Sequence, residues 1–499
     1  MRYEKNRLKA KGIPQSLLGV GVVGVVLVFL YDAWERPPHI DDAYISYRYA
    51  RNLVAGHGLV FNPGEYVEGY TNFLWTLLVA LGLAAGASAE ATAHGLSLVT
   101  GIAILVAASG YAMRALPDRA AWLAFVPAVI VLASVAFARW ATAGLESPLF
   151  VFAVTAALWA QAARRMGWCT AALCVATLTR PEGVLAAFAV YTFHLLWQRK
   201  KPLAALRAPL VFAAIVLLHG VFRLTYYGSI VPNTFYAKVG GIPFEAGVEY
   251  VRAFLRAGSV ALLLPAAWAA FRKPSLRPGA LFVVVVAAYT VLIGGDVFWH
   301  GRFLLPALPT LSVLATVGVW DWGNRNRALG AVGAVALGLA VWIPLRGIAP
   351  EGDDPGVLSR AEALAERRHF DVAYQVNDNN RIRILERRGK PVRLVAATGI
   401  GFLGYRSGLP MLDLLGLVDS TVARSSDAEQ SEGIALPGHS RSNANYVLSL
   451  RPDYLFIPQK GASDYVLLNA HWDLWEHPDF ERLYEWDSAL SGYRLRTLP

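Results

Sequence analysis

The chain has 499 residues, of which 55% are hydrophobic and only 16% charged, and its mean hydropathy is +0.40. A soluble domain usually has about 25% charged residues, so this composition excludes an ordinary soluble protein. The net charge of +10 comes from basic residues between apolar runs. That distribution indicates membrane topology and anionic lipid headgroups rather than nucleic acid. The two cysteines, Cys169 and Cys174, share one apolar run and predict neither a disulfide framework nor a zinc site.

The first apolar run, Ser16 to Tyr31, follows a basic N-terminus. A cleaved signal peptide is the competing interpretation, but no small-residue cleavage site follows the run. We therefore expect an uncleaved signal anchor whose basic flank stays in the cytoplasm. That flank contains Arg2, Lys5, Arg7, Lys9 and Lys11.

Twelve apolar segments follow one another along residues 1–346, and a helix needs about 20 apolar residues to cross a bilayer. The basic connectors fit one alternating topology only if residues 72–88 do not cross. We therefore predict about eleven spans, with the N-terminus inside and the C-terminus outside. The segments are 16–34, 72–88, 94–113, 120–138, 148–163, 167–179, 183–197, 209–225, 254–271, 279–294, 303–320 and 328–345.

The composition becomes polar from residue 347 onward. Short β-like runs (Val392 to Ala396 and Tyr454 to Ile457) alternate with helix-like stretches such as Leu358 to Arg368, a pattern typical of a small α/β domain. The sequence therefore predicts a polytopic α-helical membrane module over 1–346 and an extracytoplasmic α/β domain over 347–499.

Two adjacent carboxylates stand in the first outer loop. Asp41 and Asp42 precede a predicted helix that ends near Gly56. One Asp suffices to cap that helix, so the second needs another explanation. In sugar transfer a carboxylate can accept the proton of the attacking hydroxyl. A phosphate leaving group needs no second carboxyl as acid, unlike the alkoxide of a glycosidase.

Further charged residues lie in the other connectors that the topology places outside. Each has an ordinary structural explanation: a snorkelling Arg, a Pro–Glu helix start or a Gly-Gly-Asp turn. Together on one face they favour a pocket for an anion. If this pocket serves sugar transfer, the sugar donor must be carried by a lipid, because nucleotide sugars are cytoplasmic and the predicted site is outside. The residues are Arg139, Glu146, Arg180, Glu182, Asn233, Tyr236, Lys238, Asp296, His300 and Arg302.

The first outer loop, DDAYISYRYARNLVAGHGLVFNPGEYVEGYTNFLW (41–75), resembles that of a GT-C glycosyltransferase family. It is similar to the bacterial polyprenyl-phosphate-dependent enzymes that add terminal β-1,2 arabinofuranose to cell-wall arabinan. Further matching motifs are TAGLESPLF (142–150), LTRPEG (178–183), VPNTFYAK (231–238), GGDVFWHGRFLLP (294–306), DLLGLVDSTVAR (413–424), PGHSR (437–441) and LRPDYLFIP (450–458).

This resemblance implies a GT-C membrane module capped by an extracytoplasmic domain, with a catalytic acid in the first outer loop. That acid maps onto Asp41 or Asp42; we favour Asp41 as the base, with Asp42 supporting it or helping to bind a cation. From charge and placement we assign the donor phosphate to Arg180, Lys238, His300 and Arg302. The expected substrate-binding residues are Tyr44, Glu146, Glu182, Asn233, Tyr236, Asp296 and His439.

The expected function is inverting transfer of a sugar, with arabinofuranose the nearest analogue, from polyprenyl phosphate to an extracytoplasmic glycan. The enzyme is expected in the inner (plasma) membrane, with its site on the outer face. No metal ligand or cofactor is assigned, although the resemblance leaves a divalent cation open. Another sugar such as mannose is an alternative, as are a flippase or transporter of lipid-linked sugars and a non-catalytic assembly protein. A transporter would place polar groups along a path through the membrane, whereas here they gather on one side.

Overall fold

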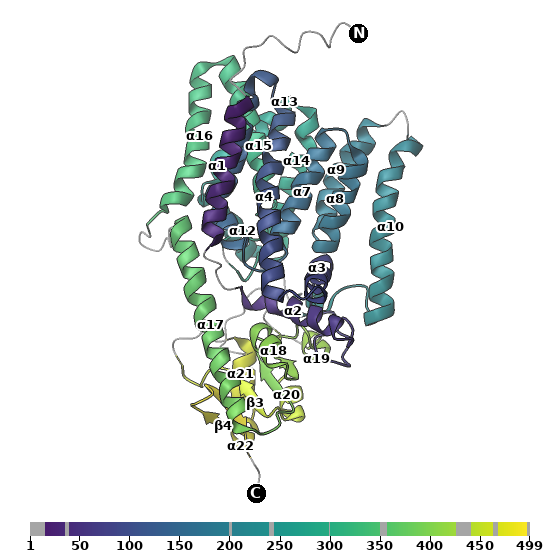
Figure 1. Ribbon diagram of the computed structural model, residues 1–499, viewed down its shortest axis with the longest axis vertical. Coiled ribbons are helices and arrows are strands. Elements are labelled where there is room, and N and C mark those ends of the chain that lie inside the picture. The colour runs from purple at the N-terminus through teal and green to yellow at the C-terminus, as the bar shows by residue number, and fades with distance from the viewer. Residues whose placement is uncertain are drawn as a thin grey trace.

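The structure is a computed structural model that describes residues 15–34, 39–198, 202–238, 244–298, 300–349, 357–425, 441–462 and 468–496. Its larger part is a bundle of helices, and a smaller part with a β-sheet lies at one end of that bundle (Figure 1). The α-helices of the larger part are α1 (Gln15–Trp34), α2 (Asp41–Val54), α3 (Phe73–Ala84), α4 (Ala89–Ala115), α5 (Val126–Ala133), α6 (Val135–Trp140), α7 (Ser147–Ala162), α8 (Met166–Thr179), α9 (Gly183–Trp197), α10 (Pro202–Tyr227), α11 (Asn233–Lys238), α12 (Phe244–Arg256), α13 (Leu263–Arg272), α14 (Arg277–Leu292), α15 (Ala307–Arg325) and α16 (Arg327–Arg346).

Among the described residues, four helices are long and apolar enough to cross a membrane, or five if one bent pair counts as a single span. The chain thus has the helices of a multi-pass membrane protein, but the predicted eleven spans are not confirmed. Five further apolar helices have 10–17 residues. The four long helices are Ala89–Ala115, Leu203–Tyr227, Pro274–Leu292 and Arg327–Arg346.

Four of the shorter helices correspond to predicted spans, and breaks inside two further predicted spans add to the difference. The apolar segment 120–138 divides into a 3₁₀ helix (Asp118–Phe125), α5 and α6, with Ser134 extended between the last two. The segment near 254–271 bends by 77° between α12 and the following 3₁₀ helix (Ser259–Leu262) and α13. Gly258 makes this bend with a φ of +98°, a backbone conformation that glycine adopts without steric cost.

Helix α3 corresponds to the segment that the predicted topology required not to cross. It has 12 residues, and at 1.5 Å per residue it extends for only about 18 Å. A bilayer core is about 30 Å thick, so α3 is too short to span it. Figure 1 shows α3 beside α2 at the end of the bundle that faces the sheet.

The smaller part begins with α17 (Arg360–Arg388) and contains a five-stranded sheet in the order β2-β1-β3-β5-β4. Strand β1 is parallel to β2 and β3, whereas β5 is antiparallel to β3 and β4. Strands β1 and β3 lie where the sequence predicts short β runs. The strands are β1 (Val395–Ala397), β2 (Met411–Asp413), β3 (Tyr454–Phe456), β4 (Tyr484–Asp487) and β5 (Gly492–Leu495), and the remaining helices are α18 (Gly401–Ser407), α19 (Ser420–Ala423), α20 (Ala444–Leu450), α21 (Asn469–Glu476) and α22 (Phe480–Leu483).

Helix α2, the loop that follows it and the sheet share one hydrophobic core. Buried side chains of α2 and its following loop, including Tyr49 and Phe61, pack with Met411 and Phe456 of the sheet. Fully buried Arg48 adds polar ties, because its guanidinium donates to the carbonyl oxygens of Phe61 (2.7 Å), Gly404 (2.8 Å) and Leu409 (2.8 Å). Helix α2 therefore has a fixed position between the bundle and the sheet (Figure 1).

Candidate active site

The acidic pair Asp41 and Asp42 forms the first turn of α2, as the sequence predicts. The residue before the helix, Ile40, is extended and makes no side-chain cap. Neither carboxylate caps α2, so the capping explanation fails for both. The helix ends at Val54, two residues before Gly56, which has a φ of +83°.

The carboxylate of Asp41 is bound by the first turn of α18. Its two oxygens accept hydrogen bonds from the backbone N–H groups of Gly401 (3.1 Å) and Phe402 (2.7 Å). Burial raises the pKa of Asp41 to about 7, and the nearby carboxylates of Asp378 and Asp42 act in the same direction, whereas the two N–H donors lower it. Asp41 thus connects helix α2 to the sheet-containing part.

Asp42 has different surroundings. Its side chain is partly exposed, and it has no hydrogen bond or ion pair with the residues that the structure describes. Its negative charge favours the protonated forms of Lys238 and Arg302: it opposes the lowering of the Lys238 pKa and adds to the raising of the Arg302 pKa. The carboxylate of Asp42 is therefore partly open to solvent and within electrostatic reach of two cationic side chains.

Lys238 is the last residue of α11, and its side chain as a whole is exposed. Its ammonium group nevertheless loses part of its water to the surrounding protein. This desolvation lowers the pKa of Lys238, and the positive charges of Arg302 and Arg180 lower it further. Asp296 and Asp42 oppose that shift. Lys238 therefore lies within electrostatic reach of both predicted arginines and of the open carboxylate.

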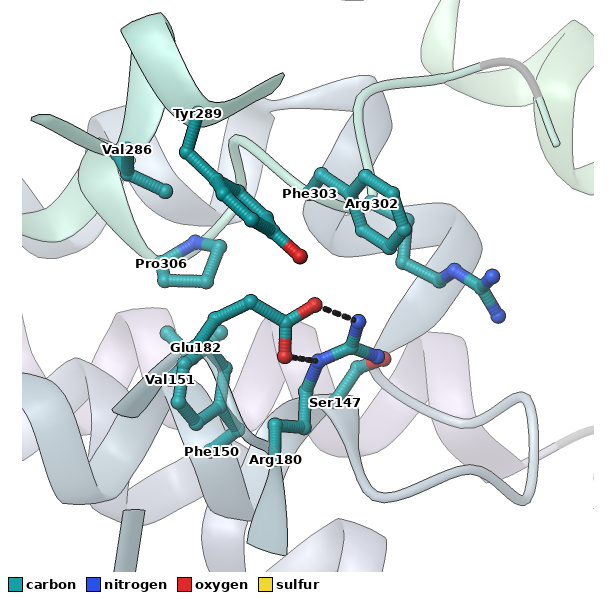
Figure 2. Close-up of a pocket in the computed structure, with 10 residues that line it drawn as sticks. All are labelled: Ser147, Phe150, Val151, Arg180, Glu182, Val286, Tyr289, Arg302, Phe303 and Pro306. Carbon is teal, nitrogen blue, oxygen red and sulfur yellow. Dashed lines mark hydrogen bonds and ion pairs between the residues drawn. The ribbon is translucent and has the colours of Figure 1, made fainter. Parts of the chain in front are cut away.

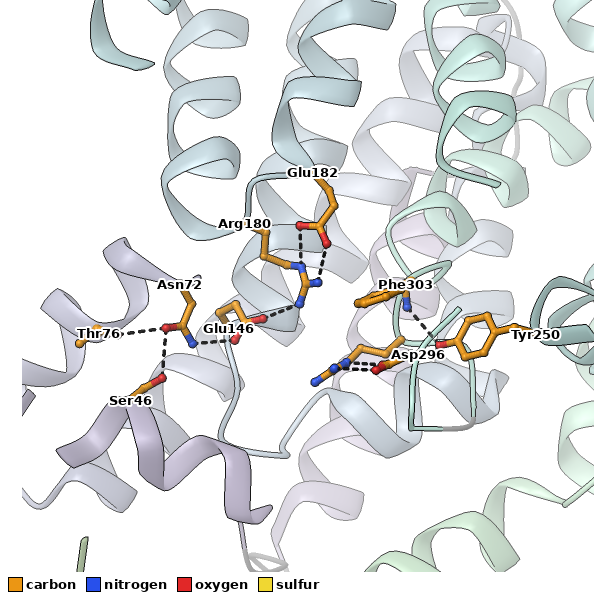
Figure 3. A network of polar contacts seen from close by, with 10 residues as sticks. Ser46, Asn72, Thr76, Glu146, Arg180, Glu182, Tyr250, Asp296 and Phe303 are labelled. Atoms are coloured by element: carbon orange, nitrogen blue, oxygen red, sulfur yellow. Dashed lines mark hydrogen bonds and ion pairs between the residues drawn. The ribbon is translucent and has the colours of Figure 1, made fainter. Parts of the chain in front are cut away.

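A buried ionic network surrounds Arg180. Its guanidinium contacts Glu146 at 2.6 Å and Glu182 at 2.8 Å. Burial would lower the pKa of Arg180, but the two carboxylates raise it above its ordinary value, and Arg180 in turn holds the pKa of Glu182 below its usual range. Glu146 also accepts from Asn72 (2.9 Å), whose side-chain oxygen accepts from Ser46 of α2 (3.1 Å; Figure 3).

Arg302 forms a second buried pair, donating to both oxygens of Asp296 at 2.7 and 2.9 Å. Figure 3 shows Asp296 with its two bonds dashed. Asp296 raises the pKa of Arg302 despite burial. This fork-like geometry is the strongest form of an Arg–carboxylate contact. It uses Nε and one terminal nitrogen; the other terminal nitrogen has no hydrogen-bond acceptor within the described ranges.

The two arginines also line a narrow pocket with Glu182 (Figure 2). Its volume of about 10 Å³ has room for about one water molecule. Apart from these charges and Ser147, its walls are aromatic or aliphatic. They comprise Phe150, Val151, Val286, Tyr289, Phe303 and Pro306. The charges thus lie beside an apolar interior, where electrostatic contacts are stronger than in water.

The other predicted residues take separate positions. His300, with a φ of +72°, contacts Glu366 of α17 at 3.1 Å, and burial lowers its pKa. Asn233 donates to the carbonyl oxygens of Gly416, Leu417 and Asp419. These two residues join the bundle to the C-terminal part, and in the part of the chain that the structure describes neither has a hydrogen bond or an ion pair with Asp42.

Two predicted aromatic residues belong to packed clusters. Tyr44 is buried and meets the rings of Tyr47 and Phe402 edge-on at 5.1 and 4.9 Å. Tyr236 lies under the guanidinium of Arg424 at 4.3 Å. The remaining prediction, His439, lies outside the described residues.

Sequence reasoning missed two residues of α17 close to the acidic pair, Tyr374 and Asp378. The charge of Asp378 raises the pKa of Asp41, and the charge of Asp41 contributes to the raised pKa of Tyr374. Burial raises the pKa of Asp378 to about 6. They stand four residues apart in one helix, so they share a face. Their only sequence signal was this spacing within a polar stretch.

The acidic pair is not arranged as a cation site. Both oxygens of Asp41 already accept backbone hydrogen bonds, which leaves one open carboxylate, whereas Mg²⁺ and Ca²⁺ require several oxygen ligands. Across the described ranges, no group of three His, Cys, Asp or Glu side chains is placed to hold a metal ion.

Two curated proteins are similar to this chain over most of its length. One, from Mycobacterium tuberculosis, is 29% identical over 71% of this chain and 66% of its own length. The other, from Corynebacterium glutamicum, is 29% identical over 62% of this chain and 52% of its own length. Both are named terminal β-(1→2)-arabinofuranosyltransferase. The predicted resemblance is therefore confirmed. The chain matches about two thirds and about half of the lengths of these relatives.

Residues 367–495 match a family described as a domain of unknown function (DUF8728). Among solved structures, ArnT from Cupriavidus metallidurans bound to undecaprenyl phosphate is 17% identical, over 79% of this chain and 85% of that chain, with a TM-score of 0.48. The Archaeoglobus fulgidus oligosaccharyltransferase in its apo form is 12% identical, over 80% of this chain and 64% of that chain, with a TM-score of 0.49.

Proposed function

We propose that this chain is a membrane glycosyltransferase of the GT-C kind that transfers arabinofuranose from polyprenyl phosphate to a glycan acceptor outside the cytoplasm. The names of both sequence relatives support the reaction and the sugar. The observation that carries the mechanism is the open carboxylate of Asp42 within electrostatic reach of Lys238 and Arg302.

Asp42 is the general base in this proposal. A base must reach the hydroxyl proton of the acceptor, and the Asp42 carboxylate makes no competing hydrogen bond to the described residues. Asp41, which we favoured from the sequence, has both oxygens engaged by α18. We therefore assign Asp41 a positioning role, because its bonds to Gly401 and Phe402 hold the first turn of α2.

Lys238 and Arg302 bind the donor phosphate in this proposal. Lys238 supplies a mobile point charge, and Arg302 offers the terminal nitrogen that Asp296 leaves free. Arg180 is held by Glu146 and Glu182, so its role is to position these groups and to add positive potential. Prearranged cations of this kind stabilise the charge that develops on a leaving phosphate.

The reaction is a single displacement. The acceptor oxygen forms a bond to the anomeric carbon while the bond from that carbon to the phosphate oxygen breaks. Asp42 takes the hydroxyl proton, and the leaving polyprenyl phosphate keeps the electron pair of the broken bond. One displacement on the face opposite the phosphate inverts the anomeric centre.

We further propose the division suggested by the sequence, with residues 1–346 as the membrane module and 347–499 as a domain on the extracytoplasmic side. The tie between Asp41 and α18 supports it, because the C-terminal part thereby covers the acidic pair. With the C-terminal part over the acidic pair, the glycan acceptor would enter from the aqueous surface and the lipid donor from the membrane.

The test is sugar transfer by purified protein from polyprenyl-phosphate arabinofuranose, with polyprenyl-phosphate mannose as the comparison donor and arabinan fragments as acceptor. Replacing Asp42 by Asn should lower kcat by at least about 100-fold, the range for loss of a general base. Asp118→Asn is the matched control, because Asp118 is exposed and starts the 3₁₀ helix Asp118–Phe125. It should retain full transfer.

Two results would count against the proposal. Normal transfer by a folded Asp42→Asn variant would remove Asp42 as the base. Preference for the mannose donor would keep the mechanism and replace the sugar. A Lys238→Gln variant separates binding from chemistry, since it should raise KM for the donor more than it lowers kcat.

A further inference from the structure

An apolar groove lies between α4, α7 and α8, away from the acidic pair. Its volume is about 810 Å³, within the range of roughly 300–1,000 Å³ that holds small ligands. Helix α7 starts at Ser147 in the narrow pocket of the candidate site and runs away from it, and α8 returns to Arg180. The groove thus opens toward the opposite end of the bundle. Its lining is Arg114, Phe152, Ala153, Ala156, Trp159, Ala160, Ala163, Arg165, Trp168, Ala171, Ala172 and Val175.

Small side chains keep this groove open. Ala153, Ala156, Ala160 and Ala163 follow one another at intervals of three and four residues, so they lie along one face of α7. Trp159 forms a wall by packing against α4, where an added Cβ at Gly110 would lie 2.5 Å from its ring.

The length of the groove matches one leaflet of a bilayer. It follows α7 from Phe152 to Ala163, a rise of about 16 Å at 1.5 Å per residue. Half of a hydrocarbon core of about 30 Å is about 15 Å. A single lipid chain lying in the groove would therefore extend from the headgroup level to the middle of the membrane.

Two arginines mark the headgroup end. Arg114 lies in the last turn of α4, and Arg165 directly precedes α8. Both side chains are exposed and line the groove, and within the described ranges neither has a hydrogen bond or an ion pair. Two unpaired guanidinium groups above an apolar channel complement a phosphate that carries acyl chains, since Arg binds phosphate with paired N–H donors.

We propose that this groove binds one anionic phospholipid in the leaflet opposite to the candidate active site, with its acyl chain along α7 and its phosphate between Arg114 and Arg165. This site is separate from the sugar-transfer reaction proposed above and does not depend on it.

Native mass spectrometry of the full-length protein in detergent tests the proposal, with phosphatidylglycerol and phosphatidylcholine as probes. Wild type should retain one phosphatidylglycerol in preference to phosphatidylcholine. An Arg114→Gln/Arg165→Gln variant should bind it about 30-fold more weakly, from the contribution of two basic residues near an anionic headgroup. Arg164→Gln is the matched control and should bind normally, because Arg164 is exposed beside Arg165 yet does not line the groove.

A second variant tests the apolar channel. Ala156→Trp fills the groove, so it should abolish retention although both arginines remain. As an independent measurement, a low fraction of brominated phosphatidylglycerol in phosphatidylcholine vesicles should quench Trp168, and a Trp168→Phe variant should lose that quenching. Equal losses in the Arg164→Gln and double variants would overturn the proposal, as would unchanged binding in Ala156→Trp or quenching independent of headgroup charge.

Discussion

Replacing Gly401 by alanine is expected to loosen the tie between α18 and the first turn of α2. An added Cβ would lie against the backbone carbonyl of Asp41, 2.7 Å from its carbon, and real Cβ contacts are almost never shorter than 3.0 Å. Helix α18 must therefore move away from Asp41.

The magnitude follows from the two hydrogen bonds that this movement lengthens. The added Cβ would lie closer still to the carbonyl oxygen of Asp41, so α18 must retreat by about 1 Å. That retreat takes the contact between the Gly401 N–H and Asp41 from 3.1 Å to about 4.1 Å, and the contact from the Phe402 N–H from 2.7 Å to about 3.7 Å, so neither remains a hydrogen bond. Loss of two hydrogen bonds to a carboxylate costs about 4 kcal/mol, and transfer should fall because Asp42 moves with Asp41.

Thermal unfolding and sugar transfer by the purified variant measure the two effects. The control is Gly338→Ala in α16, where an added Cβ meets nothing within 4 Å. Alanine is favoured over glycine inside a helix by roughly 0.5–1 kcal/mol, so the control should be at least as stable as wild type. If Gly401→Ala matched the control in stability and transfer, the proposed coupling through α18 would be refuted.

Three further changes test other contacts. The pKa of Asp41 is raised from 3.8 to about 7, so its contribution to stability is complete below about pH 4 and is lost as the pH rises through 7; the unfolding temperature should fall less across this window in Asp41→Asn than in wild type. Glu182→Gln leaves buried Arg180 with Glu146 alone and should destabilise the protein by about 3 kcal/mol, measured by thermal unfolding. Asn233→Asp removes the donor to three carbonyl groups and should accelerate limited proteolysis of the C-terminal part; an unchanged cleavage rate would contradict this tie.

Local patterns in the sequence were sufficient for parts of the site. The acidic pair was expected at a helix start, and α2 begins there. Arg180, Glu182, Asp296 and Arg302 were singled out as charged candidates, but the sequence did not predict that Arg180 pairs with Glu182, two residues away, and Arg302 with Asp296, six residues away. Such short separations leave the partners close in any compact arrangement.

Contacts between distant segments could not be predicted in this way. The bonds from Asp41 to α18 join residues 360 and 361 positions apart, and our proposal that Asp42 rather than Asp41 is the base depends on them. Hydrophobicity also could not locate the helix breaks at Ser134 and Gly258, because an apolar run stays apolar through a bend. The predicted span count depended on those runs being continuous.

The adjacency of Asp41 and Asp42 has a consequence for exchanging parts between homologues. One residue binds the C-terminal part, and the next carries the proposed chemistry, so a single peptide bond separates attachment from proton transfer. A chimaera with a foreign C-terminal part must bring a matching turn at residues 401–402, with glycine at the first position, or its acidic pair will be misplaced even when every membrane helix is native.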